Sequence, residues 1–227
     1  MASGVACLLG FAAPTARGEV LSDERTKTRY ANAVKRAPVF ERRSAGSRVV
    51  GRLRFYNEDG SLETYLALAR RSDEVGSTWV RIRLPARPNG GTGWVRVENL
   101  GPLFLVQTML LVDRRALRAT LFRRGAAIWT SRIGVGAAST PTPAGRFWIR
   151  SRLRNLGGGT VYGPWAFGTA AYSVLSDWPG GGVIGIHGTD EPWLIPGRPS
   201  HGCIRVPNRK VRRLARLMPI GTPVRIV

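Results

Sequence analysis

Short runs of β-branched and aromatic residues, separated by turn signals, constrain the fold of this chain most. Four consecutive runs cover residues 104–113, 116–124, 127–136 and 145–153, and each is bounded by turn-forming residues. This pattern predicts strands joined by tight turns. Further strands are expected within 161–175 and 180–188 and at 222–227. The second half of the chain is therefore predicted to be mainly β.

One segment predicts a helix. Asn208 is a suitable N-cap, and apolar residues follow it at helical spacing: Val211, Leu214, Leu217 and Met218. The segment is brief and is followed by PIGT, which ends a helix. We therefore expect one short helix near the C-terminus, with a final strand after it.

The region 31–101 also has strand character, but its runs are shorter. They cover 48–56, 64–68, 78–84 and 93–97, with turn signals at 57–60 and 87–91. The pattern STWVRIRLP…GTGWVRV resembles the closing strands of bacterial SH3-like domains. That resemblance implies a small SH3-like β-barrel at 31–101. An all-β extension of the following domain remains the alternative.

The first thirty residues are interpreted as a leader or signal-like segment and a linker. Residues 5–13 form an apolar run with no Lys or Arg before it, so export by this segment and a disordered leader both stay open. The run is far too short to span a bilayer as a helix. Residues 18–36 are polar without a sustained apolar period, which predicts a linker.

The charge balance indicates a polyanionic partner. The chain carries 35 Lys+Arg against 14 Asp+Glu, a formal net charge of +21. Nucleic acid, an anionic membrane surface and an anionic cell wall fit this charge equally well. The basic segment 209–217 has an apolar face and shows no interleaved aromatics or recognised binding motif, so nucleic acid is not expected.

The stretch IHGTDEPWLIPGRPSHGCIRVPN contains both histidines of the chain, His187 and His201, together with Cys203. A free cysteine has a pKa near ~8.5 and needs a base or cationic neighbour to become a nucleophile. Either histidine could supply it, while the backbone at Gly202 could hold an oxyanion. The spacing lacks the paired ligands of a zinc site, so no metal is expected. An inert buried thiol is the plainer alternative.

The IHGT and SHGCIRV segments together resemble the L,D-transpeptidase (YkuD-type) catalytic domain. TPTPAGRFWI at 140–149 and the aromatic GPWAFGTAAYS extend this resemblance over residues 104–227. It implies a YkuD-like β-sandwich catalytic domain with one short helix, placed after the SH3-like region.

The resemblance also implies roles for five residues. Cys203 would be the nucleophile and His187 the base, with the backbone carbonyl of Gly188 orienting the imidazole. His201, Gly202 and the Cys203 amide would shape the oxyanion pocket. No cofactor is implied, because a thiolate and an imidazole carry the whole reaction.

Four further residues are expected at the substrate-binding part of the site: Ser200, Arg205, Trp193 and Tyr162. Among them, Arg205 is expected to brace the site more than to contact substrate. Trp193 lies in the loop between the histidines, where it would bear on acceptor choice.

The implied reaction is a two-step acyl transfer on peptidoglycan stem peptides. A tetrapeptide stem would be cleaved after its third residue with release of D-Ala, and a neighbouring stem would accept the acyl group in a 3→3 cross-link. An extracytoplasmic location and anionic cell-wall polymers as partners follow, and no transmembrane segment is expected. An L,D-carboxypeptidase and a non-catalytic cell-wall-binding protein are the alternatives.

Overall fold

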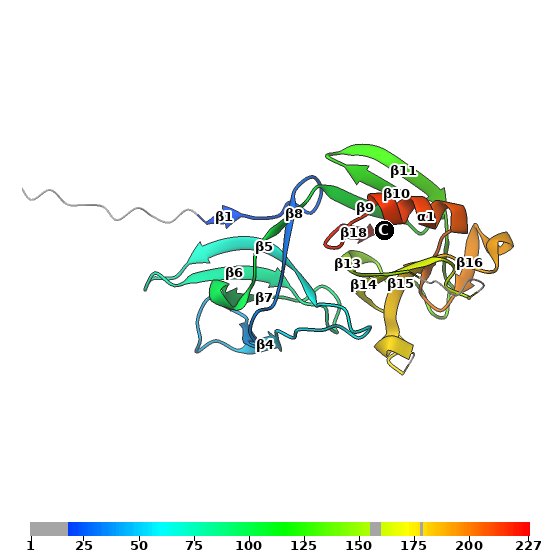
Figure 1. The fold of residues 1–227 in the computed structure, drawn as a ribbon. Helices are drawn as coiled ribbons and strands as arrows, with labels where there is room; N and C mark the ends of the chain where they lie inside the picture. Colours follow the sequence, from blue (N-terminus) through cyan, green and yellow to red (C-terminus); the bar gives the residue numbers. More distant parts are fainter. Residues whose placement is uncertain (1–17, 155–159, 178) are drawn as a thin grey trace, which may run out of the picture.

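The computed structural model describes residues 18–154, 160–177 and 179–227 (Figure 1). The leader expected at residues 1–17 therefore lies outside the described residues. Two β-sheets lie side by side, and the described residues contain one α-helix, α1 (Asn208–Leu217). The prediction of a mainly β chain with one short helix near the C-terminus is confirmed.

The first sheet is antiparallel and is built from the N-terminal half of the chain. Its strands are β1 (Glu19–Val20), β2 (Thr28–Asn32), β3 (Pro38–Phe40), β4 (Val49–Arg52), β5 (Thr64–Ser72), β6 (Thr78–Arg83), β7 (Thr92–Arg96) and β8 (Phe104–Val106). Their order is β4-β3-β7-β6-β5-β2-β8, with β1 on β5. A 3-10 turn, η1 (Val97–Asn99), follows β7. The N-terminal β region is thus present, and its SH3-like family remains a prediction.

The second sheet is mixed and curls around helix α1. Its strands are β9 (Thr108–Asp113), β10 (Arg118–Arg123), β11 (Ala126–Arg132), β12 (Gly134–Gly136), β13 (Gly145–Arg154), β14 (Trp165–Tyr172), β15 (Val183–His187), β16 (Gly197–Ser200), β17 (Ile204–Arg205) and β18 (Pro223–Ile226). They run β11-β10-β9-β18-β13-β14-β15-β17-β12-β16, with 3-10 turns η2 (Pro179–Gly182) and η3 (Pro192–Leu194). The result is a curled half-barrel rather than two stacked sheets (Figure 1).

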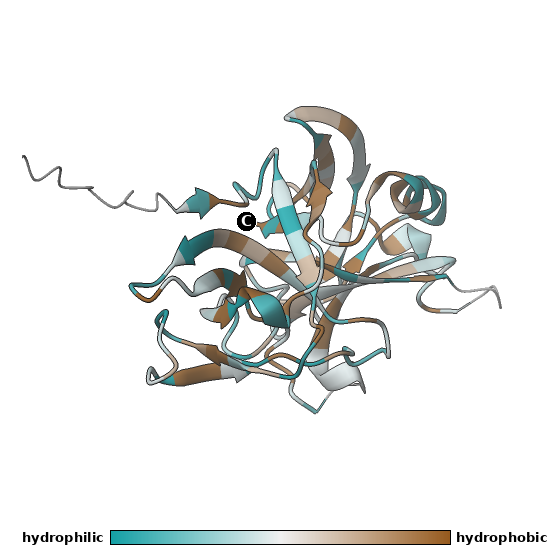
Figure 2. Ribbon diagram, turned by 60° about the vertical axis from the view of Figure 1, so that its left-hand side comes forward, coloured by the Kyte–Doolittle hydropathy of each residue, from teal (hydrophilic) through white to brown (hydrophobic). Residues whose placement is uncertain are grey.

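Alternation of apolar and polar residues explains how both sheets bury one face. β9 alternates buried and half-buried residues along its length, as a strand with one covered face does. The ribbon in Figure 2 carries brown and teal segments along the same strands. Helix α1 buries Val211, Leu214 and Ala215 against the second sheet, which confirms the predicted apolar face.

Two expectations about the N-terminal connection are wrong. The segment 18–36 is not a linker, because β2 lies between β5 and β8 in the first sheet, with Thr28 and Ala31 buried. The predicted strand 104–113 is interrupted at Gln107, where the chain leaves the first sheet after β8 and enters the second at β9. Pairing with distant strands decided both cases, and local residue pattern does not encode that pairing.

A buried charge cluster joins the two sheets. Arg150 on β13 is 1% exposed and donates to both oxygens of Glu63, at 2.8 Å from Nε and 2.5 Å from Nη2. Glu63 is itself fully buried and also accepts from Arg54 at 2.9 Å. Arg150 Nη2 lies 2.8 Å from Glu58 as well, and the Tyr172 hydroxyl donates to Glu58 at 2.7 Å.

The cluster keeps Glu58 ionised. Burial opposes ionisation of Glu58, but the Tyr172 hydrogen bond and the Arg150 charge together hold its pKa at about 2. A buried cation is tolerated only when such partners surround it. The N-terminal sheet therefore supplies groups that the second sheet needs in order to bury Arg150.

Candidate active site

Neighbouring parallel strands bring His187 and Cys203 together. His187 ends β15, and Cys203 directly precedes β17, which pairs with β15 through Ile186 opposite Ile204. The N–H of Gly185 donates to Cys203 Sγ at 3.3 Å. A Cβ on Gly185 would lie 3.6 Å from His187 Cδ2 and 3.7 Å from Cys203 Sγ. The imidazole and the thiol therefore share the space above Gly185.

The backbone sets the tautomer of His187. Its Nδ1 lies 2.6 Å from the carbonyl oxygen of Gly188, which can only accept a hydrogen bond. Nδ1 therefore carries the proton, and Nε2 keeps its lone pair. The ring is 5% exposed, and Tyr162 packs edge-on against it with 5.0 Å between ring centroids. This is the position that the family resemblance implies for the Gly188 carbonyl.

Burial makes the resting pair neutral. Desolvation lowers the pKa of His187 to about 4, although the Gly188 carbonyl opposes this shift. Desolvation also raises the pKa of the Cys203 thiol, against the Gly185 N–H and the Arg205 charge. At neutral pH the site therefore holds a thiol beside an uncharged imidazole. The imidazole can accept the thiol proton as a nucleophile forms.

The pH dependence of Cys203 alkylation tests this neutral pair. We expect the iodoacetamide rate at Cys203 to keep rising from pH 7 through the ordinary thiol pKa of ~8.5, because burial raises the pKa of this thiol. Peptide mapping by mass spectrometry separates Cys203 from Cys7. A rate that is already level between pH 6 and pH 8 would show a preformed thiolate and contradict the neutral pair.

The turn before Cys203 is held by hydroxyl groups. Gly202 adopts φ +121, and a Cβ there would lie 2.7 Å from Ile184 Cδ1, so the position requires glycine. Ser200 is 4% exposed, donates to the Cys203 carbonyl at 2.6 Å and accepts from the Gly202 N–H at 3.2 Å. Thr142 donates to the Gly202 carbonyl at 2.7 Å.

These contacts refine two sequence-based expectations. The Ser200 hydroxyl is engaged inside the turn, so the structure places it as a brace for Cys203 rather than open to substrate. The Gly202 N–H is likewise occupied by Ser200. Sequence analysis did not single out Thr142, although the TPTPAG segment that contains it was noted.

The remaining predicted residues lie at different depths. The side chain of His201 is exposed, unlike that of His187. Arg205 pairs with Glu191 at 2.6 Å and so ties β17 to the loop after β15, which is a bracing contact. Tyr162 is 47% exposed and contacts His187, whereas Trp193 on η3 is 74% exposed. Tyr162 therefore lies beside His187, and Trp193 is largely exposed to solvent.

Asn208 belongs to the site rather than to the helix cap. The N-cap position of α1 is Pro207, and no side-chain cap hydrogen bond forms, so the predicted cap is wrong. Asn208 Oδ1 instead accepts from the Thr189 N–H at 2.9 Å, and its Nδ2 donates to the Thr189 carbonyl at 2.9 Å. A Cβ on Gly188 would lie 2.3 Å from Oδ1. Asn208 therefore holds the loop that presents the Gly188 carbonyl to His187.

Replacing Asn208 tests this bracing. We expect Asn208→Ala to slow acylation of Cys203 about tenfold or more, since two hydrogen bonds of ~0.5–1.5 kcal/mol each are lost beside His187. Asn208→Asp keeps the acceptor for Thr189 and should lose less. Acylation by a carbapenem, followed by intact-protein mass spectrometry, gives the rates. Equal rates in Asn208→Ala and the unmodified chain would exclude a positioning role.

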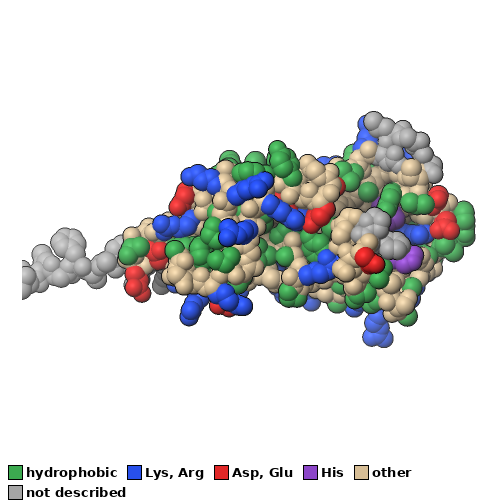
Figure 3. Space-filling view, turned by 90° about the horizontal axis from the view of Figure 1, so that it is seen from below, with side chains coloured by type: hydrophobic (Ala, Val, Ile, Leu, Met, Phe, Trp, Pro, Cys, Tyr) green, Lys and Arg blue, Asp and Glu red, His purple; other side chains and the backbone are tan. Residues whose placement is uncertain are grey.

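Two absences concern the residues that the structure describes. No group of three His, Cys, Asp or Glu residues within 18–154, 160–177 and 179–227 is placed to hold a metal ion. Within the same ranges, no helix has the length and apolar character needed to cross a membrane. Figure 3 shows Lys and Arg side chains spread over both halves of the face seen from below, with histidine at the surface of one half.

Comparisons with known proteins match the C-terminal half of the chain. A family model for the L,D-transpeptidase catalytic domain (YkuD) matches residues 107–226. The candidate L,D-transpeptidase YkuD of Bacillus subtilis (strain 168) is 38% identical over 130 residues, which are 57% of this chain and 72% of that protein. Its counterpart in Bacillus licheniformis is 39% identical over 115 residues, 51% of this chain and 61% of that protein.

A solved structure is similar over the same half of the chain. The crystal structure of a mutant Enterococcus faecium L,D-transpeptidase shares 24% identity with a TM-score of 0.40, over 53% of this chain and 49% of that one. The chain thus spans about half the length of the Enterococcus protein.

Proposed function

Because the chain belongs to the YkuD family of L,D-transpeptidase catalytic domains, we propose that it transfers acyl groups between peptidoglycan stem peptides through Cys203. One observation carries the proposal: a histidine with its Nδ1 fixed on the Gly188 carbonyl shares the space above Gly185 with a thiol. Such a pair is the machinery of nucleophilic acyl transfer.

In the first half-reaction, His187 Nε2 takes the proton of Cys203 as the sulfur attacks the carbonyl carbon of the third stem residue. The resulting oxyanion faces backbone N–H groups at the turn 201–203, where the Cys203 amide is the proposed donor. Collapse breaks the bond to the fourth residue, and the imidazolium returns its proton to the leaving amine of D-Ala. A thioester on Cys203 remains.

In the second half-reaction, the side-chain amine of a neighbouring diamino acid attacks the thioester. His187 accepts a proton from the amine, the new amide forms, and Cys203 leaves as a thiolate that is reprotonated. The product is a 3→3 cross-link. The Gly185 N–H supports the thiolate at both stages, because it already donates to Sγ in the resting site.

The surrounding residues have supporting roles in this proposal. Ser200 and Gly202 hold the turn at Cys203, while Arg205 braces β17 through Glu191. Tyr162, which packs against His187, and the exposed Trp193 are the proposed contacts for stem peptides. The exposed His201 is proposed to act beside the turn at Cys203. The peptidoglycan substrates of the family imply an extracytoplasmic location.

Transfer to water instead of an amine would make the protein an L,D-carboxypeptidase. The acyl-enzyme is the same, and the acceptor alone differs. A purely non-catalytic wall-binding role is disfavoured, because the imidazole tautomer and the Gly185 contact serve chemistry and not adhesion.

Muropeptide analysis tests the proposal. Purified protein is incubated with tetrapeptide-containing muropeptides, and the products are separated and weighed by mass spectrometry. We expect 3→3 dimers in which each donor stem has lost its D-Ala. Free tripeptides without dimers would assign the carboxypeptidase reaction. Unchanged tetrapeptides, from protein whose Cys203 still reacts with iodoacetamide, would overturn acyl transfer on this substrate.

A further inference from the structure

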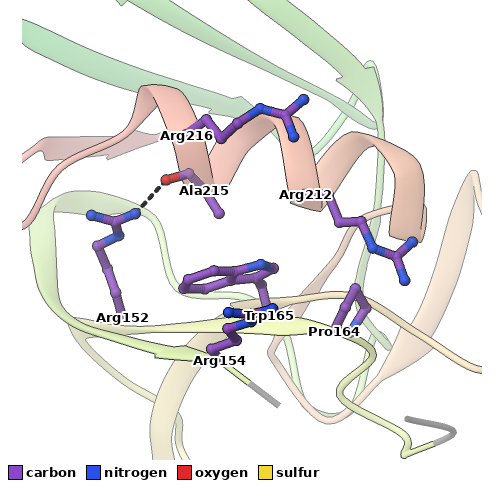
Figure 4. A pocket seen from close by; sticks show the side chains of 7 residues that line it. All are labelled: Arg152, Arg154, Pro164, Trp165, Arg212, Ala215 and Arg216. Carbon is purple, nitrogen blue, oxygen red and sulfur yellow. Dashed lines mark hydrogen bonds between the residues drawn. The ribbon is translucent and has the colours of Figure 1, made fainter. Parts of the chain in front are cut away.

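An arginine-lined pocket lies on the catalytic half, between helix α1 and the β13–β14 hairpin (Figure 4). Its cavity has a volume of about 580 Å³. Its lining includes four arginines, Arg152, Arg154, Arg212 and Arg216, with Trp165 and Pro164 between them. Neither half of the proposed acyl transfer uses any of these side chains.

The spacing of the four arginines along β13 and α1 places their side chains around the same pocket. Arg152 and Arg154 are two residues apart on β13 and so share a face of the strand. Arg212 and Arg216 are four apart on α1 and share a face of the helix. Trp165 pairs with Arg154 across the hairpin, so its indole lies between the two arginine pairs (Figure 4).

The pocket has a concentrated positive charge. No Asp or Glu is among the residues that line it, and across the described ranges no carboxylate forms an ion pair with any of the four arginines. Arg152 is anchored within the part of the chain that the structure describes, because it donates to the Ala215 carbonyl and its guanidinium lies 5.7 Å from the Trp165 ring centroid. The others, on exposed positions, present unneutralised guanidinium groups.

The pocket is connected to the catalytic pair through the backbone. Trp165 begins β14, its carbonyl accepts from the Gly188 N–H at 3.1 Å, and Ala166 pairs with His187. A polymer seated in the pocket would therefore run past the side of the site where the Gly188 carbonyl orients His187.

From this arrangement we propose that the pocket binds the phosphodiester groups of an anionic cell-wall polymer, such as a polyol-phosphate chain. Guanidinium groups pair bidentately with phosphate oxygens, and the indole offers a flat surface for a sugar or polyol. Repeated phosphates match four separated charges better than the single carboxylate of a peptide terminus does.

A wall polymer is favoured over nucleic acid by location. The proposal rests on the proposed function, which puts the chain at peptidoglycan, where a phosphodiester polymer would hold the enzyme beside its substrate. Nucleic acid has the same backbone chemistry and becomes an outcome of the test.

The experiment compares two matched double variants of the full chain. Arg212→Gln/Arg216→Gln removes two charges from the pocket. Arg118→Gln/Arg132→Gln removes two charges from exposed, cross-strand-paired positions on β10 and β11, outside the pocket lining. Binding is measured by pelleting with sacculi that keep their phosphodiester polymers and with sacculi stripped of them by hydrofluoric acid. Soluble poly(glycerol phosphate) and duplex DNA of equal phosphate content serve as competitors.

We expect the pocket variant to lose about tenfold in affinity for intact sacculi and the control to lose less than about twofold, with the salt dependence reduced in the pocket variant. Stripping should weaken the unmodified chain to the level of the pocket variant, and poly(glycerol phosphate) should compete. Equal losses of affinity in both variants would mean that net charge alone causes the effect, and this would overturn the pocket proposal. Unchanged binding to stripped sacculi, or DNA as the stronger competitor at the same arginines, would also overturn the proposal.

Acylation of Cys203 by a carbapenem is measured on the same proteins. We expect it to be unchanged in the pocket variant, because neither Arg212 nor Arg216 is part of the catalytic machinery. The pelleting assay measures binding and requires no turnover. Failure of the pocket proposal can therefore be distinguished from failure of the acyl-transfer proposal.

Discussion

Cys203→Ser is expected to abolish acyl transfer, with no measurable cross-linking and no covalent carbapenem adduct. A serine hydroxyl in the same place keeps nearly the same volume but is a far weaker acid and a weaker nucleophile than a thiol, at a site arranged for sulfur. Adduct formation is followed by intact-protein mass spectrometry, and circular dichroism checks the fold. The second cysteine, Cys7, provides the matched control, since Cys7→Ser should retain full labelling.

The two histidines should respond unequally in the same assay. His187→Ala removes the buried base and should slow acylation by about 10²–10⁴-fold. His201→Ala changes an exposed side chain beside the turn at Cys203 and should have a much smaller effect. A persistent adduct in Cys203→Ser, or equal losses for both histidines, would contradict the assignment of nucleophile and base.

Glu63→Ala should destabilise the whole protein by about 3–5 kcal/mol, because it leaves the buried Arg150 without its closest partner. Urea unfolding, followed by tryptophan fluorescence, measures the free energy of unfolding. Glu41→Ala is the matched control, since Glu41 forms an ion pair of similar length with Arg48 at the surface. Loss of that exposed pair should change the free energy of unfolding far less, because solvent screens it.

The same cluster bears on whether the catalytic half folds alone. A fragment of residues 104–227 would expose Arg150 and also free the Trp148 indole N–H, which donates to the Thr64 carbonyl at 2.8 Å. We therefore expect this fragment to be less stable than the full chain. If Glu63→Ala costs no more than Glu41→Ala, the two sheets are independent, and the fragment should then be fully active.

Local signals were sufficient to single out His187 and Cys203, which the structure places close together. The strand that ends at His187 and the SHGC turn are both short, contiguous segments. A histidine and a cysteine in such neighbouring segments are enough to suggest a base beside a thiol. The apolar face of α1 was predicted for the same reason, since its period lies within one element.

Contacts between distant segments could not be predicted. Asn208 looked like a helix cap because an Asn before a basic, apolar-periodic run usually caps it, yet its amide is used by Thr189 across the site. Gly185 carried no signal at all, since its importance lies in the side chain it lacks. Segment 18–36 appeared to be a linker because the partners that make β2 a strand are β5 and β8.

The short connection between the two sheets at Gln107 has a mechanical consequence. β8 ends at Val106 in one sheet and β9 begins at Thr108 in the other, so a single residue separates them. The Arg150 cluster bridges the same two halves, so they are joined both by a short connection and by buried ion pairs. If the proposed acyl transfer holds, a surface of the first half that binds the wall would restrict the distance and orientation of Cys203 relative to the point of attachment. The positions of the cross-links made at Cys203 would then depend on where the first half is attached to the wall.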